Sequence, residues 1–417
     1  MDRRVDSPLK TSVQGTAPRW LPPALLAITS TILTLVVLEG AARVALRMQG
    51  QGKEAGEVAQ YTEYDPILGW RKRPGARVVY RRREYTVEVA INRRGLRDPE
   101  RDYAAPPGTL RLLALGDSFV EGYTVPLPQT VTQVLESSLT RDGHPAEVIN
   151  GGTAGYSTDQ ELLFYRHEGH LYAPRIVLLF FHYNDIVYNN RQDYFGTPKP
   201  VFEMGGGNLR VHRIPVRERP PEAAPATAVA EPESGSALVE WIRDRMWYGA
   251  PRAYNSVARL GLWPPMPQVP TRLELRVYET RREAEIEDAW EKTAALLAAA
   301  ARDVEAHDGR LLVVYAPNRM EVDDGSWRLS RQLYGWNEQG WDRRRVAERL
   351  MQVGRENGFP VLDLTGPLRR ANEGWGAKPY LTYDAHWTRH GHRVAAEEVQ
   401  RYLSGNGWLE GQPSLRP

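Results

Sequence analysis

The chain has 417 residues, which suits one large α/β domain with insertions or two smaller domains. Its hydrophobic fraction of 41% and charged fraction of 25% are ordinary for a globular protein, so wholesale disorder and a collagen-like structure are excluded. The net charge is only +2, from 54 basic and 52 acidic side chains, so no nucleic-acid partner is expected. The absence of cysteine removes disulfides, thiolate metal sites and a cysteine nucleophile.

The first predicted element is an apolar helix near the N-terminus. Leu21 to Leu38 carry no charge, and a helix of this length rises about 27 Å, close to the thickness of the bilayer core. We therefore predict a transmembrane anchor over residues 21–46. The basic side chains before it place residues 1–20 in the cytoplasm and the remaining chain outside, in the periplasm or at the cell surface. A cleaved signal peptide is the alternative, but its apolar core is usually shorter than this run.

The segment over residues 47–107 is predicted to hold a stalk and a β hairpin. Residues 48–60 are polar and contain glycine, which suggests the stalk. Residues 78–92 read VVYRRREYTVEVAIN, and alternating, β-branched side chains are typical of a hairpin or of edge strands. Both features place this segment outside the domain that begins at residue 108.

Over residues 108–405 short apolar strands alternate with helices. Five apolar runs, LRLLAL, EVIN, IVLLFF, RLLVVY and VLDL, lack polar alternation, as strands buried on both faces do. Helices are predicted near residues 130–140, 158–171, 280–307, 342–357 and 389–403. This alternation indicates an α/β fold with a parallel sheet between layers of helices. Ligands bind at the carboxyl ends of the strands of such a sheet, so we expect the chemistry there.

The alternation is interrupted over residues 187–278, which we predict to be an insertion. Within it, residues 215–237 are rich in proline, alanine and glutamate, and this composition favours a loop without regular structure. The aromatic residues that follow are Trp241, Trp247, Tyr248, Tyr254 and Trp263. We expect them to pack onto the core; a lid, a sugar-stacking wall and a membrane-facing belt are the alternatives. Residues 406–417 form a C-terminal tail.

Four short segments carry the residue types of catalysis. Gly116-Asp117-Ser118 follows a predicted strand, where a serine lies exposed above the sheet or serves as a helix N-cap. The stretch from Asn150 to Gly155 follows the next strand, and its glycines either expose backbone N–H groups or form a plain turn. Asn184-Asp185 follows the third strand and offers an amide N–H or a turn. The stretch from Tyr383 to His392 precedes the last helix and holds three histidines.

Metal binding is one interpretation of the last segment, since His386 and His390 are four residues apart, as on a helix face. No glutamate stands between them to act as a general base, and the segment has the pattern of a loop that enters a helix, so neither a metal nor a cofactor is predicted. A serine, a histidine near a carboxylate, and separate N–H donors are instead the groups that cleave esters by nucleophilic attack.

The order and content of the four segments resemble the SGNH/GDSL hydrolase superfamily over residues 61–403. The flanks YDPILGWR, NRRGLRD and LDLTGPLRR resemble a membrane-anchored bacterial subgroup. The resemblance implies a three-layer α/β/α fold of the flavodoxin-like type with a parallel sheet, here preceded by the N-terminal transmembrane helix.

The resemblance also implies the roles of the site residues. Ser118 is the nucleophile, His386 is the general base, and Asp384 orients His386. The oxyanion is held by the backbone N–H groups of Ser118 and Gly155 and by the side-chain amide of Asn184.

The last segment departs from the pattern of many superfamily members, which have two residues between the aspartate and the histidine. This chain has one, Ala385. Anchored subgroups resemble the shorter form, so His386 stays the predicted base in preference to the two later histidines, which lie within the start of a helix. In the glycine-rich segment, Gly155 is the predicted oxyanion donor and Gly152 is its competitor.

The function that follows is that of an extracytoplasmic serine esterase that cleaves acyl esters, such as acetyl esters of a glycan or lipid. An O-acyltransferase is one alternative, since it uses the same acyl-enzyme and differs only in the acceptor. A lone anchor helix supplies no path for an acyl donor, which favours the hydrolase. A catalytically silent glycan-binding scaffold is the other alternative, and the presence of every expected catalytic residue type argues against it.

Overall fold

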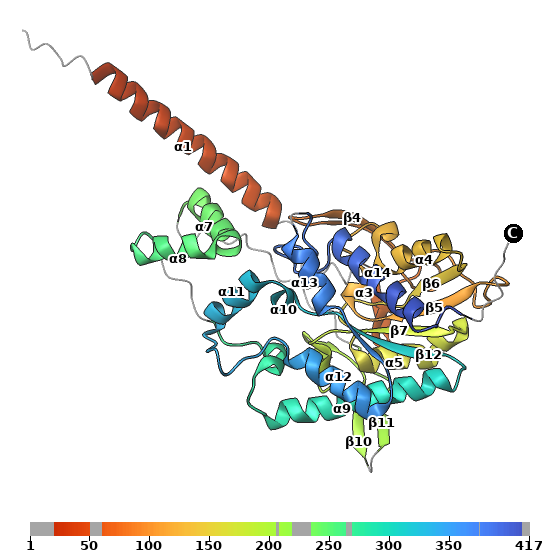
Figure 1. Cartoon of the computed structure of the whole chain (residues 1–417). Helices are drawn as coiled ribbons and strands as arrows, with labels where there is room; N and C mark the ends of the chain where they lie inside the picture. The colour runs from red at the N-terminus through yellow and green to blue at the C-terminus, as the bar shows by residue number, and fades with distance from the viewer. Residues whose placement is uncertain are drawn as a thin grey trace, which may run out of the picture. The chain divides into compact units, whose positions relative to one another are not determined.

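A computed structural model of the chain describes residues 21–50, 61–205, 208–218, 235–263, 269–374 and 376–410 (Figure 1). The predicted N-terminal tail, most of the predicted stalk and proline-rich loop, and the end of the C-terminal tail lie outside these residues. The chain divides into two compact units, one of residues 1–51 and 228–249 and the other of residues 52–227 and 250–417.

The smaller unit consists of α1 (Leu21–Gly50) and α7 (Ala237–Gly249). Within α1, Leu25–Ala45 is long and apolar enough to cross a membrane, with a mean hydropathy of 1.9, although a signal sequence would pass the same test. Glu39 follows the apolar run and accepts hydrogen bonds of 2.8–2.9 Å from the Ser236 hydroxyl and from the first two backbone N–H groups of α7. The carboxylate therefore caps the N-terminus of α7.

The larger unit is built on a five-stranded parallel sheet in the order β13-β12-β7-β5-β6. The strands are β5 (Leu110–Leu115), β6 (Ala146–Asn150), β7 (Ile176–Phe181), β12 (Arg310–Tyr315) and β13 (Val361–Asp363). These are the five predicted apolar runs, and β5 and β7 are buried along their whole length. The strand order reverses between β5 and β7, which is the point where sheets of this kind bind ligands.

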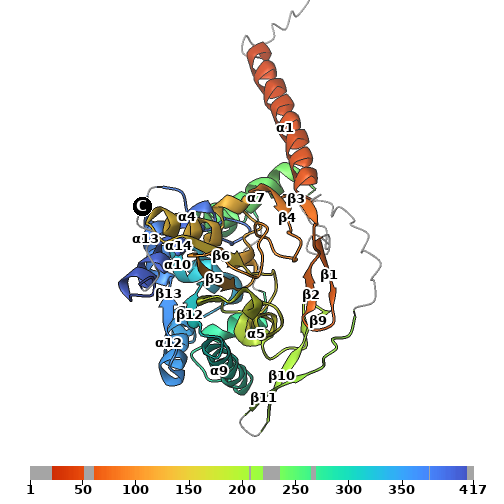
Figure 2. The ribbon, with the colours of Figure 1, turned by 90° about the vertical axis from the view of Figure 1, so that its right-hand side faces the viewer.

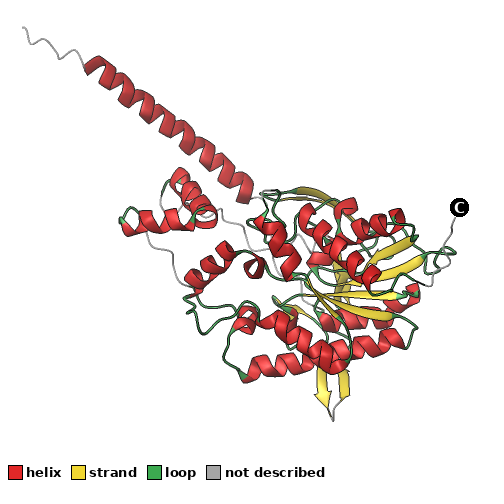
Figure 3. Cartoon of the chain, viewed as in Figure 1, coloured by secondary structure: helices red, strands yellow, loops and turns green. Residues whose placement is uncertain are grey.

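Helices cover both faces of the sheet (Figures 1 and 3). One core contains strand residues such as Leu113 and Leu115 with side chains of α5 (Thr158–His167), α9 (Ala284–Glu305) and α12 (Arg345–Asn357). The other contains Leu112 and Ala114 with side chains of α4 (Val131–Arg141), α13 (Thr365–Glu373) and α14 (Arg389–Gly405). Alternate residues of each strand thus face opposite layers, and the three-layer α/β/α prediction is confirmed.

The remaining elements are short. The other helices of the larger unit are α3 (Ser118–Glu121), α6 (Asp185–Tyr188), α8 (Pro251–Arg259), α10 (Arg319–Val322) and α11 (Asp324–Tyr334), with 3-10 turns at Leu127–Gln129, Gly169–Tyr172 and Leu273–Tyr278. The helix predicted over residues 158–171 is divided, because α5 ends where Gly169 packs closely on Leu113.

Four antiparallel pairs lie outside the parallel sheet in the described chain. They are β1–β2 (Thr62–Asp65, Gly69–Lys72), β3–β4 (Arg77–Arg81, Thr86–Ala90), β8–β9 (Asp193–Tyr194, Thr197–Pro198) and β10–β11 (Val201–Gly205, Asn208–His212). The β3–β4 pair is the predicted hairpin. Figure 2 shows β1, β2 and β9 together on one side of the sheet, where the backbone of Gly69 packs against that of Pro198.

Candidate active site

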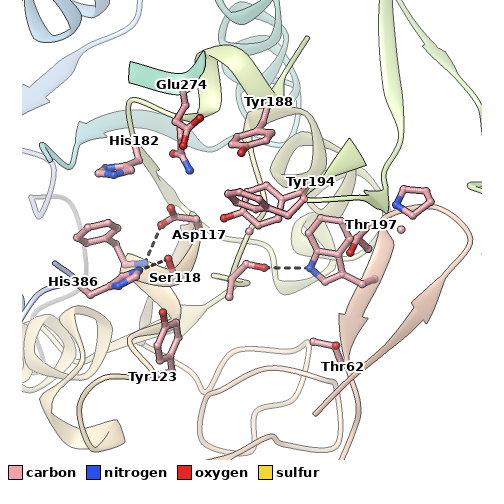
Figure 4. Close-up of a pocket in the computed structure, with 18 of the residues that line it drawn as sticks. Thr62, Asp117, Ser118, Tyr123, His182, Tyr188, Tyr194, Thr197, Glu274 and His386 are labelled. Carbon is pink, nitrogen blue, oxygen red and sulfur yellow. Dashed lines mark hydrogen bonds between the residues drawn. The ribbon is translucent and has the colours of Figure 1, made fainter. Parts of the chain in front are cut away.

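The four sequence segments meet at one pocket of about 1030 Å³ (Figure 4). All five predicted site residues line it: Ser118, Gly155, Asn184, Asp384 and His386. The pocket lies where the carboxyl ends of β5, β6 and β7 come together, because these strands run parallel and end at the same edge of the sheet.

Ser118 is raised above the sheet by a tight turn after β5. It is the first residue of α3, and the helix is capped by Asp117, whose carboxylate accepts a hydrogen bond of 2.9 Å from the Phe119 N–H. A Cβ on Gly116 would lie 2.5 Å from a methyl carbon of Val120, so the turn needs glycine at this position. The alternative role of Ser118 as the helix N-cap is therefore filled by its neighbour.

Ser118, His386 and Asp384 form a continuous chain of hydrogen bonds. Ser118 Oγ and His386 Nε2 are 2.7 Å apart (Figure 4), and His386 Nδ1 is hydrogen-bonded to Asp384 Oδ1. The carboxylate assigns the ring proton to Nδ1, which leaves Nε2 as the acceptor for the serine hydroxyl. Burial alone would lower the pKa of His386, but the hydrogen bond and charge of Asp384 outweigh it, so this pKa lies above its usual value.

The residue between the aspartate and the histidine has an unusual backbone conformation. Ala385 has a φ of +66°, in the left-handed region that alanine rarely adopts. This conformation accompanies the direct contact between Asp384 and His386 across a single intervening residue. Strain of this kind persists only where surrounding structure holds the segment in place.

The β3–β4 hairpin provides that support. Glu84, in its turn, accepts hydrogen bonds from three consecutive backbone N–H groups, those of Thr382, Tyr383 and Asp384, at 2.6, 2.7 and 3.0 Å. The hydroxyl of Tyr85 donates to Asp384 Oδ2 at 3.0 Å. This support could not be predicted from the sequence, because no local pattern links residues that are about 300 positions apart in the chain.

Three hydrogen-bond donors at the pocket have no acceptor among the described residues: the backbone N–H groups of Ser118 and Gly155 and the Asn184 side-chain amide. Gly152 differs, since its N–H donates to Asn150 Oδ1 at 3.1 Å and a Cβ there would lie 2.5 Å from the backbone nitrogen of Glu121. Gly152 thus allows close packing against α3. Because its N–H is already hydrogen-bonded, Gly155 is favoured as the donor to a ligand oxygen.

A buried acidic residue without a hydrogen-bond partner lies on α5. Glu161 is 1% exposed, and neither of its carboxylate oxygens is hydrogen-bonded within the described chain. Burial, and then the nearby charge of Asp185, raise the pKa of Glu161 well above its usual value. The neighbouring Asp159 is instead paired with the buried ammonium group of Lys199 at 2.7 Å.

Aromatic side chains line much of the pocket: Trp70, Phe119, Tyr123, Tyr183, Tyr188, Tyr194 and Phe195. No local sequence pattern marks them as pocket residues. Among the aromatics expected to pack onto the core, Tyr254 is buried and its ring is tilted against that of Trp263, with ring centres 5.4 Å apart, so these two serve packing.

Residues 114–394 match the GDSL-like lipase/acylhydrolase family, which is more than half of the 417 residues. The chain belongs to this family. It is therefore an esterase-like hydrolase, and the matched region of this GDSL-family protein contains all four segments predicted to be catalytic. The match begins after α1 and after the β3–β4 hairpin, so membership of a membrane-anchored subgroup stays a prediction.

Several solved structures are distantly similar to this GDSL-family chain. A lipase/acylhydrolase from Enterococcus faecalis is 12% identical, covers 71% of this chain and 96% of its own, and has a TM-score of 0.37. An acetylxylan esterase, Axe2, from Geobacillus stearothermophilus is 11% identical, covers 70% and 94%, and has a TM-score of 0.36. At these values no substrate follows from the similarity. No curated protein matches the chain.

Proposed function

We propose that this protein hydrolyses acyl esters through an acyl-enzyme on Ser118, with His386 as general base and Asp384 as its orienting partner. The observation that carries the proposal is the 2.7 Å contact between Ser118 Oγ and His386 Nε2, in a pocket that also holds Asn184 and Gly155. Nucleophile, base and orienting carboxylate in such contact are the groups that acyl transfer requires.

The reaction begins when Ser118 Oγ forms a bond to the ester carbonyl carbon and His386 Nε2 takes the hydroxyl proton. The bond from that carbon to the alcohol oxygen then breaks, and the alcohol leaves with the proton from His386. Water next attacks the acyl-enzyme and gives a proton to His386, which returns it to Ser118 Oγ as the carboxylic acid leaves. Asp384 stabilises the imidazolium at each stage.

Negative charge develops on the carbonyl oxygen when Ser118 attacks. The N–H groups of Ser118 and Gly155 and the Asn184 amide are the donors proposed to stabilise it, since each faces the pocket without another acceptor in the described chain. One such donor typically contributes about 3 kcal/mol to the transition state.

We also propose that α1 stays uncleaved and anchors the enzyme, with the hydrolase domain outside the cytoplasm. The length and mean hydropathy of 1.9 of Leu25–Ala45 support this. The test is alkaline extraction of membranes that contain the full chain with an N-terminal tag. Retention of the tagged protein in the pellet supports the anchor, whereas a soluble protein without the tag shows a cleaved signal.

The catalytic proposal is tested with the full chain in detergent and with p-nitrophenyl acetate as substrate. Ser118→Ala should lower kcat by about 10⁴-fold or more without changing the circular dichroism spectrum. Retained activity in this variant contradicts the proposal. If repeated turnover of p-nitrophenyl acetate by the wild type requires an added sugar acceptor, the protein is an O-acyltransferase and the hydrolase proposal is wrong.

A further inference from the structure

The turn between β8 and β9 presents an exposed aromatic residue at the active-site pocket. Phe195 lines the pocket, is 67% exposed and has a φ of +46°, and the following Gly196 has a φ of +79°. A two-residue hairpin turn with both residues left-handed usually has asparagine, aspartate or glycine at its first position. Phenylalanine there is strained and stays largely exposed, so neither turn preference nor burial accounts for it.

Phe195 is the outermost of three neighbouring rings that we call the aromatic wall (Tyr188, Tyr194 and Phe195). Its ring centre lies 4.8 Å from that of Tyr194 and 5.8 Å from that of Tyr188. The Tyr194 ring packs on Gly155, since a Cβ on that glycine would lie 2.7 Å from the ring. The aromatic wall therefore begins beside a proposed oxyanion donor, and Figure 4 shows Tyr188 and Tyr194 across the pocket from Ser118 and His386.

Charged groups line the pocket together with the aromatic wall. Glu274 and Arg272 both line it, with their charged groups 3.9 Å apart and with 13% and 68% of the side chains exposed. Ring faces beside a carboxylate and a guanidinium suit a sugar, whose C–H face stacks on aromatic rings and whose hydroxyls hydrogen-bond to charged groups. The acyl chain of a lipid has no hydroxyls with which to hydrogen-bond to these charged groups.

We propose that the aromatic wall is a subsite for the sugar ring of an O-acylated saccharide, with Phe195 as its outer stacking residue. The sugar is the alcohol of the ester, so it leaves from beside Gly155 with its hydroxyl oxygen protonated by His386. This inference rests on the proposed esterase function and specifies its substrate class.

The test compares two acetyl esters on the full chain in detergent: glucose pentaacetate, which carries the sugar ring, and ethyl acetate, which does not. Phe195→Ala should lower kcat/KM for glucose pentaacetate about tenfold, mainly through KM, and leave ethyl acetate within about twofold. Phe195→Trp keeps an aromatic ring, so it should retain the wild-type kcat/KM for glucose pentaacetate. Phe195→Asn tolerates the left-handed turn but lacks the ring, so it should lose the same activity as the alanine variant.

The other outcomes overturn the inference in distinguishable ways. An equal loss for both esters in Phe195→Ala and Phe195→Asn means that the Phe195 ring supports the catalytic groups and is not a sugar subsite. Unchanged hydrolysis of glucose pentaacetate in both variants removes the subsite. p-Nitrophenyl palmitate is assayed as a third ester. If Phe195→Ala loses activity toward this ester alone, the occupant of the subsite is a lipid acyl chain. A wild-type protein that cleaves neither acetyl ester contradicts the esterase proposal, and the subsite with it.

Discussion

The carboxylate of Glu84 accepts a hydrogen bond of 3.0 Å from the backbone N–H of Asp384, 300 residues later in the chain. The β3–β4 hairpin that carries Glu84 lies before residues 114–394, the region shared with the GDSL-like family. A segment outside the family region therefore holds the loop with the proposed general base and its orienting carboxylate. Precise placement of such groups has a large effect on rate.

Removal of the Glu84 carboxylate should impair catalysis more than substrate binding. Glu84→Ala frees three backbone N–H groups of the loop, so we expect kcat for p-nitrophenyl acetate to fall about tenfold or more with KM nearly unchanged. Glu84→Gln keeps one acceptor oxygen and should lose less. The matched control is Glu88→Ala, which removes an exposed carboxylate paired with Arg77 in the same hairpin. Equal kcat values in the two alanine variants contradict the prediction.

The pH dependence of kcat/KM should reflect the raised pKa of His386. The base acts in its neutral form, so the rate should rise with pH with a midpoint above the ordinary histidine value of about 6.5. Tyr85→Phe removes a hydrogen bond to Asp384, whose carboxylate then attracts the His386 proton more strongly and moves the midpoint to still higher pH. Rate measurements from pH 5 to 9 decide this. A flat profile between pH 5 and 8 excludes His386 as the base.

Gly155→Ala should damage the oxyanion site in two ways. Its φ of +81° disfavours alanine, and the added Cβ would lie 2.7 Å from the Tyr194 ring, so we expect kcat to fall about 100-fold. Gly143→Ala is the control, because Gly143 has a φ of +88° but no atom within 4 Å of the added Cβ. That variant should lose about 1 kcal/mol of stability and keep its kcat. A similar kcat for both variants removes Gly155 from the site.

Asn184→Ala should lower kcat on the order of 100-fold with the thermal unfolding curve unchanged, since it removes one donor to the developing oxyanion. Asn190→Ala serves as a comparison, because Asn190 accepts a hydrogen bond of 2.7 Å from Lys292 and does not line the pocket. We expect its kcat to match the wild type. Should Asn184→Ala retain full kcat, the amide takes no part in catalysis.

Glu161 should make the protein less stable as pH rises. Its folded-state pKa is raised, so the folded protein retains a proton that the unfolded chain releases above about pH 4.3. The free energy of unfolding therefore falls between pH 5 and 8, and Glu161→Gln should make this fall smaller. Urea unfolding of the wild type and the variant at pH 5 and at pH 8 measures this change in the free energy of unfolding. An equal fall in the wild type and the variant is the contradicting result.

Much of the fold and the meeting of the catalytic segments could be predicted from the sequence. Strands such as β5 and β7 are buried on both faces, and that environment leaves an uninterrupted apolar run in the chain. The carboxyl ends of parallel strands share one edge of the sheet, so Ser118, Gly155 and Asn184 were expected to meet there. His386 was selected by the resemblance to a family, since its neighbours His390 and His392 have the same chemistry.

Other features depend on contacts that no local pattern records. Gly152 and Gly155 are equivalent as turn formers until folding pairs the N–H of Gly152 with Asn150 and leaves that of Gly155, which lines the pocket, without an acceptor among the described residues. No local pattern predicts the aromatic wall, because its rings come from α6, from β8 and from a left-handed turn where turn preferences disfavour phenylalanine.

The sequence by itself determined the parallel α/β architecture and the residues that can act as nucleophile, base and oxyanion donors. The architecture follows from the sequence because strands buried on both faces leave uninterrupted apolar runs between helical segments, whereas the roles of the site residues came from the resemblance to a family. Only the tertiary structure decided how Asp384 is held by Glu84 and Tyr85, and which rings stand beside Ser118. Those contacts join segments that are distant in the chain, and their energy exists only once the segments have packed together.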